Sequence, residues 1–429
     1  MSFSGSELAC VQVYCSVFQA VRIEYHRMVT LCSHGTRDSF TFYFIENTAE
    51  INMGYHLITG ATGLLGRYLI RDLASAGVPL AVLVRPTRRM TVDQRIDMIM
   101  GFWDDQMGRE LPRPVVLEGN INEENLGLSP EQLDWATKNV DHMIHSAASL
   151  SFYSTSLESE PWRSNVGGVK KVLDFCKTAG IRNFNHVSTA YVCGLRTGRI
   201  MESDVDVGQE TGNDYERSKL EAELLVRSAD HFDSLTVFRP AIIIGDSKTG
   251  FTNTFHGFYA ALQLGYTLTQ MQTPDETGRL YAKSRFTLDG DESKNLIPVD
   301  WVSAVMAYIL THPKHHGKTY HLTPLHPVQS RLVHDVLEAT CNFYGSEFAG
   351  GGVELKDPTE AERLFYDHIR VYNSYWRDDP VFDSTNTQTA APHLPCPHID
   401  RELLTRLSRV AIDMNFSWND RTPHRFGVK

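Results

Sequence analysis

Short apolar segments alternate with amphipathic segments along the chain from residue 55 onwards. Apolar runs of roughly four to eight residues predict strands. Behind the first run, Leu65, Leu69 and Leu73 repeat every four residues and predict a helix with one buried face. Such alternation is typical of βαβ units in a parallel sheet. The predicted strands are 55–59, 81–84, 115–118, 143–145, 184–188 and 235–244 (interrupted at Pro240), and the sheet is expected to return at 297–299.

A second amphipathic helix is predicted over residues 165–179. Val169 and Cys176 lie on its apolar stripe, and Gly180 is placed to end it. Helices of this kind, inserted between buried strands, cover both faces of an open sheet. We therefore predict an α/β fold, a Rossmann-type doubly wound parallel sheet with a smaller, mainly helical C-terminal domain.

The composition excludes several classes of protein. The chain has 429 residues, with 41 Lys and Arg against 52 Asp and Glu, so its formal net charge is -11. That acidic balance argues against nucleic acid as a partner. No apolar stretch reaches the ~18 residues that a membrane-spanning helix needs, so no transmembrane segment is expected. The seven cysteines show no CxxC pair and no regular spacing, which is typical of reduced thiols in a cytoplasmic protein.

A glycine-rich turn joins the first predicted strand to the first predicted helix. It contains Gly60, Gly63 and Gly66 in the sequence TGATGLLG. At this spacing the first glycine permits a tight turn, the second lets the backbone approach a pyrophosphate, and the third allows close packing of helix on strand. The start of the helix adds free N–H groups and a partial positive charge. Its place between a strand and a helix makes the turn a strong sign of dinucleotide binding.

The residues after the second predicted strand indicate which nicotinamide cofactor binds. An acidic residue there holds the ribose 2′-hydroxyl of NAD, whereas a cation suits the 2′-phosphate of NADP. This chain has Arg85, followed by Arg88 and Arg89. We expect Arg85 to contact the phosphate and at least one of the other two to be solvated surface charge. The sequence therefore favours NADP.

Tyr215 and Lys219 lie four residues apart at the start of a predicted helix, so both side chains emerge on one face. A free phenol has a pKa of about 10, and we expect the neighbouring ammonium to lower it and make Tyr215 a usable proton donor. A YxxxK pair alone is common by chance. It gains weight from Ser188 and Thr189, which follow a predicted strand where open α/β sheets bind ligands. Either hydroxyl can help to hold an oxyanion, and we choose Thr189.

Together these motifs resemble those of the extended short-chain dehydrogenases/reductases. The chain is most similar to the branch that contains thioester reductase domains and fatty acyl-CoA reductases. The resemblance extends from about Tyr55 to about Leu322. The segments that carry it are the glycine turn, 145–148 (HSAA), 165–166 (NV), 187–192 (VSTAYV), Tyr215 with Lys219, 239–240 (RP) and 297–300 (IPVD).

The resemblance implies a site and an activity. Thr189, Tyr215 and Lys219 are the implied catalytic residues. The implied cofactor-binding residues are Gly60, Thr62, Gly63, Leu64, Leu65, Gly66, Arg85, Asn120, Ile121, Ala147, Ala148 and Pro240. Asn120 stands where many relatives carry Asp beside the adenine, and its amide can still donate and accept there. The implied activity is NADPH-dependent reduction of an acyl thioester, delivered as acyl-CoA or on an acyl-carrier protein, to an aldehyde or an alcohol, with no metal.

Two other classes of function stay open. A sugar-nucleotide epimerase or dehydratase, or a hydroxysteroid-like dehydrogenase, would share the glycine turn and the catalytic trio. The HSAA and VSTAYV segments, with Arg85, favour the thioester reductase. A non-catalytic NADP-binding regulatory protein usually lacks the tyrosine or the lysine of the trio, and both are present here. Acyl chain length, carrier, product and oligomeric state are left undetermined.

The expected organisation separates cofactor binding from substrate binding. The expected parts are an extension over 1–52, an NADP-binding Rossmann domain over 53–245 completed by 296–325, and a substrate-binding region over 246–295 and 326–429. The extension is interpreted as a poorly ordered arm or as sequence ahead of a true start at Met53. A helix over 400–414 is expected to pack against the substrate region.

Two further clusters allow less specific interpretations. An apolar pattern before the sheet returns predicts either the wall of an acyl channel or a plain core helix. Its members are Phe251, Phe255, Phe258, Tyr259, Leu262 and Leu264. Four histidines gather near a predicted loop without the spacing of metal ligands, and we interpret them as surface residues. They are His312, His315, His316 and His321.

Overall fold

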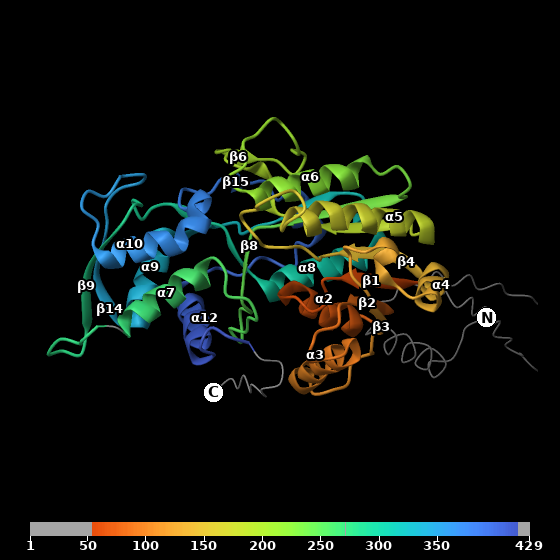
Figure 1. Ribbon diagram of the computed structural model, residues 1–429, viewed down its shortest axis with the longest axis horizontal. Coiled ribbons are helices and arrows are strands. Elements are labelled where there is room, and N and C mark those ends of the chain that lie inside the picture. Colours follow the sequence, from red (N-terminus) through yellow and green to blue (C-terminus); the bar gives the residue numbers. More distant parts are fainter. Residues whose placement is uncertain (1–53, 271, 419–429) are drawn as a thin grey trace, which may run out of the picture. The chain divides into compact units, whose positions relative to one another are not determined.

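The computed structural model describes residues 54–270 and 272–418. The predicted extension over 1–52 and the suggested start at Met53 lie outside these residues. Seven parallel strands form the main sheet in the order β12-β7-β5-β4-β1-β2-β3 (Figure 1). They are β1 Tyr55–Thr59, β2 Leu80–Val84, β3 Val115–Glu118, β4 Val140–His145, β5 Asn183–Val187, β7 Ser234–Pro240 and β12 Thr319–Leu322. The order reverses between β1 and β4, where open α/β sheets bind ligands.

Helices cover both faces of the sheet because successive strand residues point to opposite sides. Leu57 belongs to the core under α4, α5 and α6, whereas its neighbour Ile58 belongs to the core under α2, α3 and α8. Figure 1 shows these helices as two layers with the strands between them. The helices are α2 Leu64–Ser75, α3 Val92–Met107, α4 Pro130–Asn139, α5 Val169–Ala179, α6 Asp214–Ser228 and α8 Val299–Leu310. The predicted doubly wound Rossmann-type sheet is confirmed.

The chain leaves the main sheet at Pro240, contrary to the single interrupted strand expected over 235–244. Strand β8 (Ile242–Ile244) instead pairs with β11 (Leu296–Pro298) in a separate two-stranded sheet. The return expected at 297–299 is therefore wrong for the main sheet, whose edge strand is β12. Proline has no backbone N–H to donate to a ladder, which makes the end of β7 a natural place for the change of partner.

The helix predicted over 165–179 begins differently from the prediction. Its first residues form a π-helical turn, η2 (Arg163–Gly168), and α5 follows from Val169. A Cβ added at Gly168 would lie 2.9 Å from Ile121 Cδ1, so this turn packs tightly on the loop after β3. Gly180 ends the helix in the left-handed region, as predicted, with φ of 73°.

The C-terminal region is mainly helical, as predicted, but it also contains a strand pair that the sequence did not indicate. Helices α7 (Phe258–Thr269), α9 (Ser330–Cys341) and α12 (Arg401–Asp413) share one apolar core. Leu403 and Leu407 of α12 are buried in that core, which confirms the packing expected for this helix. Beside it, β9 (Leu280–Phe286) pairs in parallel with β14 (Phe343–Phe348).

Short elements complete the described chain, and none of its helices is long and apolar enough to cross a membrane. These elements are β6 Arg199–Ile200, β10 Ser293–Lys294, β13 Val328–Gln329, β15 Val381–Phe382, α10 Glu360–Ile369, α11 Thr385–Ala390, η1 Glu124–Gly127, η3 Ala190–Cys193, η4 Pro313–His315 and η5 Arg370–Tyr375. One histidine contradicts the surface interpretation. His321 is fully buried on β12, where its Nδ1 lies 2.7 Å from the carbonyl oxygen of Asp383.

Candidate active site

The glycine turn lies at the carboxyl end of β1 and is closely packed on two sides. Gly60 has φ of 75°, and a Cβ there would lie 2.7 Å from the backbone nitrogen of Ala147. A Cβ at Gly66 would overlap the carbonyl oxygen of Gly60 and lie 2.8 Å from Ala61 Cα. Both positions therefore require glycine for space, and Gly60 also for its backbone conformation.

Gly63 differs from the other two glycines because it is exposed and less closely packed. It is the exposed N-cap of α2 and receives no side-chain cap. The nearest atom to a Cβ at this position would be the carbonyl oxygen of Gly60, at 3.3 Å. An exposed helix start without a side-chain cap is suited to a phosphate group. The residues present at this turn fit a dinucleotide.

An arginine that the sequence reasoning missed joins the glycine turn to the end of β2. Arg95 of α3 donates from Nη1 to the carbonyl oxygen of Arg85 at 2.5 Å and from Nη2 to Thr62 Oγ1 at 3.0 Å. The side chain of Arg85 is exposed. Arg95 therefore connects the glycine turn to the strand end at which the sequence analysis expects the cofactor ribose. Arg95 lies on α3, 10 residues after Arg85. The sequence analysis considered only the residues that directly follow the second strand.

The other predicted cofactor residues separate into two groups. A single cavity is lined by Gly60, Gly63, Leu64, Leu65, Gly66, Ala148 and Pro240. Thr62, Arg85, Asn120, Ile121 and Ala147 are not among its lining residues. Asn120 is engaged locally, since its amide donates to Glu123 Oε1 at 3.1 Å and its oxygen accepts from the backbone of Asn122 at 3.2 Å.

All three predicted catalytic residues line the same cavity. Thr189 follows β5 as the N-cap of η3, and its hydroxyl lies 3.4 Å from the carbonyl oxygen of Pro240. Tyr215 stands in the first turn of α6. Burial raises the pKa of Tyr215 to about 12, a hydrogen bond from Thr189 lowers it, and the charge of Glu216 raises it. The expected lowering by Lys219 is therefore not observed, and burial dominates instead.

Lys219 is held in place by a backbone contact. Its side chain is 3% exposed, and Nζ donates to the carbonyl oxygen of Val187 at 2.7 Å. Burial lowers the pKa of Lys219 to about 8, against the opposing charge of Glu223. With a pKa of about 8, Lys219 can gain and lose its proton near neutral pH.

The structure distinguishes the two hydroxyls at the end of β5. Ser188 Oγ donates to Glu223 Oε2 at 2.6 Å, within a buried network. Arg239 of β7 donates to the same carboxylate at 2.6 and 3.0 Å, and both side chains of this ion pair have no exposed surface. The hydroxyl of Ser188 is thus engaged in a buried hydrogen bond. Thr189 has no carboxylate partner among the described residues, and its hydroxyl donates to the carbonyl oxygen of Pro240, at 3.4 Å.

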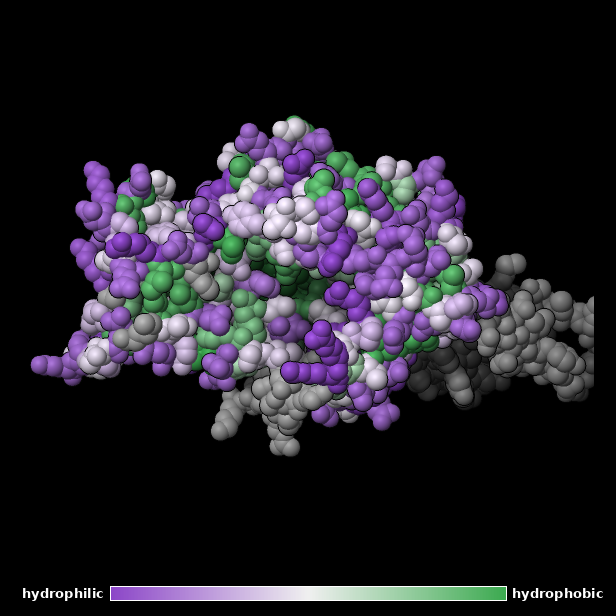
Figure 2. Space-filling model, viewed as in Figure 1, coloured by the Kyte–Doolittle hydropathy of each residue, from purple (hydrophilic) through white to green (hydrophobic). Residues whose placement is uncertain are grey.

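The cavity has a volume of about 630 Å³ and continues from the trio into the C-terminal region. Figure 2 shows a recess with hydrophobic walls near the middle of one face. Phe152 packs edge-to-face on Tyr215 of the trio and on Tyr372 and Tyr375 of the cavity wall. The apolar segment that was expected to form either a channel wall or a core helix contributes to both. Phe258 and Tyr259 line the cavity, whereas Leu262 is buried in the core.

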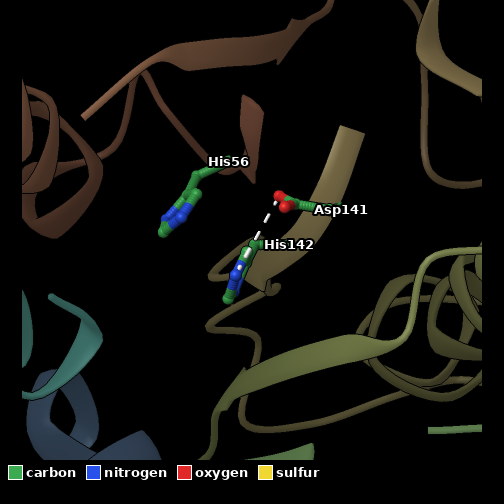
Figure 3. Close-up of side chains that lie close together, drawn as sticks. All are labelled: His56, Asp141 and His142. Atoms are coloured by element: carbon green, nitrogen blue, oxygen red, sulfur yellow. Dashed lines mark ion pairs between the residues drawn. The ribbon is translucent and has the colours of Figure 1, made fainter. Parts of the chain in front are cut away.

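A group of potential metal ligands lies near the amino ends of the central strands, whereas Thr189 of the trio follows the carboxyl end of β5. Within the described residues, His56, Asp141 and His142 offer ligand atoms within 4.8 Å of one another (Figure 3). They stand near the amino ends of β1 and β4. The two imidazole rings are stacked, with centroids 4.1 Å apart and planes at 25°, so their in-plane lone pairs run side by side instead of converging. That the catalytic site uses no metal stays a prediction.

Comparisons with known proteins agree with this architecture. A family model described as "Male sterility protein", of the NAD-binding type, matches residues 58–306, more than half of the chain. An aldehyde reductase of Aspergillus flavus is 25% identical over 395 residues, covering 83% of this chain and 36% of the relative. The chain spans roughly a quarter to a third of the length of the first curated relatives it matches.

Two solved structures show the same fold. The terminal R domain of the myxalamid PKS-NRPS pathway has a TM-score of 0.66 at 23% identity, covering 85% of this chain and 92% of that one. A thiolation-reductase di-domain of an archaeal non-ribosomal peptide synthetase has a TM-score of 0.63 at 19% identity, covering 85% and 76%. These two structures confirm the predicted fold, and the family model over residues 58–306 confirms the predicted family.

Proposed function

Because the chain belongs to the NAD-binding male sterility protein family, we propose that it is an NADPH-dependent reductase of acyl thioesters. One observation carries the proposal. Thr189, Tyr215 and Lys219 line the same cavity as Gly60 and Gly63, which supports proton donors and a nucleotide turn serving one site. The aldehyde reductase among the relatives and the thiolation domain beside one structural neighbour support a thioester substrate.

NADP is proposed over NAD because cations stand at the end of β2. Arg95 holds Thr62 and the Arg85 backbone, and Arg85 extends into solvent. A guanidinium pairs well with a phosphate dianion and has no acceptor for a 2′-hydroxyl donor. When bound, NADPH supplies the hydride that reduces the carbonyl carbon.

Residues of the chain stabilise and protonate the oxygen of that carbonyl. Tyr215 and Thr189 donate hydrogen bonds to the oxygen as it gains negative charge, and Tyr215 gives up its proton. Lys219 lines the same cavity, and burial lowers its pKa to about 8, which suits it to gain and lose a proton near neutral pH. The apolar cavity walls exclude water and hold the acyl chain. Collapse of the tetrahedral intermediate returns its hydroxyl proton to the Tyr215 phenolate, expels the thiolate and leaves an aldehyde, and reduction of the aldehyde with a second NADPH would give an alcohol.

The test is a reductase assay on the full chain. NADPH oxidation is followed with acyl-CoAs from hexanoyl to hexadecanoyl and with the same acyl groups on a carrier protein, and the product is identified by mass spectrometry. The Tyr215→Phe variant is expected to lose activity by roughly a hundredfold or more and to keep NADPH binding. Tyr281→Phe, at an exposed tyrosine, is the matched control. Turnover of a nucleotide sugar, with none of any acyl thioester, would overturn the proposal.

A further inference from the structure

Helix α7 forms one wall of the cavity along nearly its whole length. The lining residues recur at spacings of three and four, so they share one face of the helix: Phe258, Ala261, Gly265 and Leu268. The sequence of α7 contains no charged residue. Ala261, Gly265 and Leu268 keep part of their surface exposed, whereas Leu262 is fully buried in the shared core. The wall is therefore apolar and faces a hollow.

The wall begins beside the catalytic trio. A Cβ on Gly257, the N-cap of α7, would lie 3.8 Å from Ile242 Cγ2. Ile242 opens β8 shortly after Pro240, whose carbonyl oxygen accepts from the hydroxyl of Thr189 at 3.4 Å. The first turn of α7 thus lies close to the strand end that carries one member of the trio.

A second set of contacts joins the start of α7 to the catalytic tyrosine. His256, just before the helix, has its Nδ1 3.5 Å from the hydroxyl of Tyr372. The ring of Tyr372 packs edge-to-face on Phe152, with centroids 5.2 Å apart. Phe152 in turn packs on Tyr215, with centroids 5.8 Å apart. Both sets of contacts therefore place the amino end of α7 on the side of the trio.

The wall continues to the end of α9. Cys341 is the last residue of α9, and its Sγ would lie 3.8 Å from a Cβ on Gly265. Strand β14 begins at Phe343, and both Cys341 and Phe343 line the cavity. Helix α7 therefore extends from beside β8 towards β14 (Figure 1). At 1.5 Å of rise per residue, the wall from Phe258 to Leu268 is about 15 Å long.

Gly265 is required neither by its backbone conformation nor by close packing. It stands inside a helix with helical backbone, where glycine is less stable than alanine. The distance of 3.8 Å from a Cβ to Cys341 is an ordinary van der Waals contact, so a side chain could be added without displacing the wall. Gly66 differs, because a Cβ there would overlap a backbone carbonyl oxygen. What glycine preserves at position 265 is the space in front of the helix.

We propose that Gly265 determines how long an acyl chain the reductase accepts, by leaving the wall of α7 open one turn before its end. An acyl chain whose thioester carbonyl is at Tyr215 enters beside Phe258 and follows the apolar face of α7. Each methylene that it buries against this face strengthens binding. A side chain at position 265 would occupy the path and shorten it. This inference rests on the proposed reductase function and names a residue that sets its specificity.

The position of a substitution along α7 should decide how much of the chain is excluded. Ala261 lies on the same face as Gly265, one turn nearer to the trio. Four residues of helix rise about 6 Å. An extended alkyl chain advances roughly 1.3 Å per carbon, because its tetrahedral carbons are about 1.5 Å apart. Ala261→Leu should therefore limit the chain to a length about four or five carbons shorter than Gly265→Leu does.

The experiment measures how kcat/KM depends on chain length, on the full chain with NADPH. The substrates are the saturated acyl-CoAs of even length from hexanoyl to hexadecanoyl. In Gly265→Leu the ratio of kcat/KM for the longest chain to that for the shortest should fall by roughly a hundredfold, because several methylenes lose their contacts. In Ala261→Leu the fall should begin at shorter chains. An unchanged ratio in Gly265→Leu, or a fall that begins at shorter chains there than in Ala261→Leu, would overturn the proposal.

Two further variants separate lost space from a disturbed helix. Gly265→Ala adds one methyl group, so it should lower the same ratio by a smaller factor while raising the midpoint of urea denaturation. Gln263→Leu is the matched control, since it adds leucine to α7 at an exposed residue that is not among those lining the cavity. Its dependence on chain length should equal that of the wild type. A fall in Gln263→Leu as large as that in Gly265→Leu would overturn the proposal.

A binding measurement keeps this proposal distinguishable from the reductase function. If no acyl-CoA is reduced, the proposed function fails, and calorimetric titration with S-alkyl-CoA thioethers from hexyl to hexadecyl then tests the cavity alone. Affinity that rises with chain length in the wild type, and is lost for the longer thioethers in Gly265→Leu, would support the proposal without the reaction. The same dependence of affinity on length in both proteins would overturn it.

Discussion

The main sheet and the C-terminal region are assembled from contacts of different range. In the main sheet β1 pairs with β2, and a single helix separates them in sequence. In the C-terminal region β9 pairs with β14, across two α-helices and four strands of intervening chain. Periodic patterns act locally, so they define the sheet well and the C-terminal region poorly.

The ion pairs of the two regions differ in the same way. Glu223 and Arg239 in the sheet region have no exposed surface and support the strand end that carries Ser188. Glu362 and Arg285 join α10 to β9, and Arg285 is 26% exposed. The first pair fixes the floor of the site and the second ties together a wall of the cavity. Substitutions in the two regions should therefore differ in size and in what they disturb.

The largest effect is expected from Gly66→Ala in the glycine turn. The added Cβ would overlap the carbonyl oxygen of Gly60 and crowd Ala61, and backbone atoms cannot move aside cheaply. We expect loss of NADPH binding and a loss of roughly 4 kcal/mol or more in the free energy of unfolding, measured by urea denaturation and by cofactor fluorescence. Gly101→Ala on α3 has no atom within 4 Å and should stabilise the protein by about 0.5–1 kcal/mol. Similar behaviour of the two variants would contradict this account of the turn.

The second effect, from Glu223→Gln, tests the fully buried pair. The substitution leaves the Arg239 guanidinium without a counter-charge in the interior, and the free energy of unfolding should fall by about 3 kcal/mol. Glu223 also raises the pKa of Lys219, so the variant should lose the Lys219 proton at a lower pH than the wild type. Urea denaturation and the pH profile of kcat/KM measure the two consequences. An unchanged stability would show that the pair contributes nothing to the sheet region.

The third effect, from Glu362→Gln, should be smaller because its partner is partly exposed. We expect a loss of about 2 kcal/mol at neutral pH. Hydrogen bonds from Arg285 lower the pKa of Glu362 to about 2 from its usual 4.5. A depressed carboxyl pKa stabilises the folded state above the unfolded pKa, and that contribution is lost as pH falls from about 4.5 towards 2. The difference between wild type and variant should therefore shrink over this range, and a constant difference would contradict the ion pair as its cause.

The same contrast explains how much of the molecule could be predicted. The first and third strands agree with the structure at every residue, because apolar runs between turns mark buried strands. The partner of β8 and the pairing of β9 with β14 could not be predicted, because each depends on a segment distant in sequence. His321 was misplaced on the surface for the same reason, since only the sheet order shows that β12 is covered.

The site residues also separate into those that a local pattern indicates and those that depend on contacts distant in sequence. Thr189, Tyr215 and Lys219 could be brought together because each follows a recognisable strand end or helix start, and all three line one cavity. The pKa of Tyr215 was misjudged, since spacing indicates a neighbouring ammonium but not the burial that outweighs it. Arg95 was missed because no local pattern connects a helix surface to the turn of another βα unit.

The smallest effect is expected from Arg95→Gln, which tests that missed connection. The substitution removes the guanidinium that holds Thr62 and the Arg85 backbone, so NADPH should bind about tenfold more weakly, equivalent to 1.4 kcal/mol. Binding of NADH should change little, because it has no 2′-phosphate to lose contact with a cation. Arg88→Gln, at an exposed arginine beyond β2, is the matched control. Equal weakening of both cofactors in Arg95→Gln would mean that Arg95 only orders the turn and that Arg85 alone selects the phosphate.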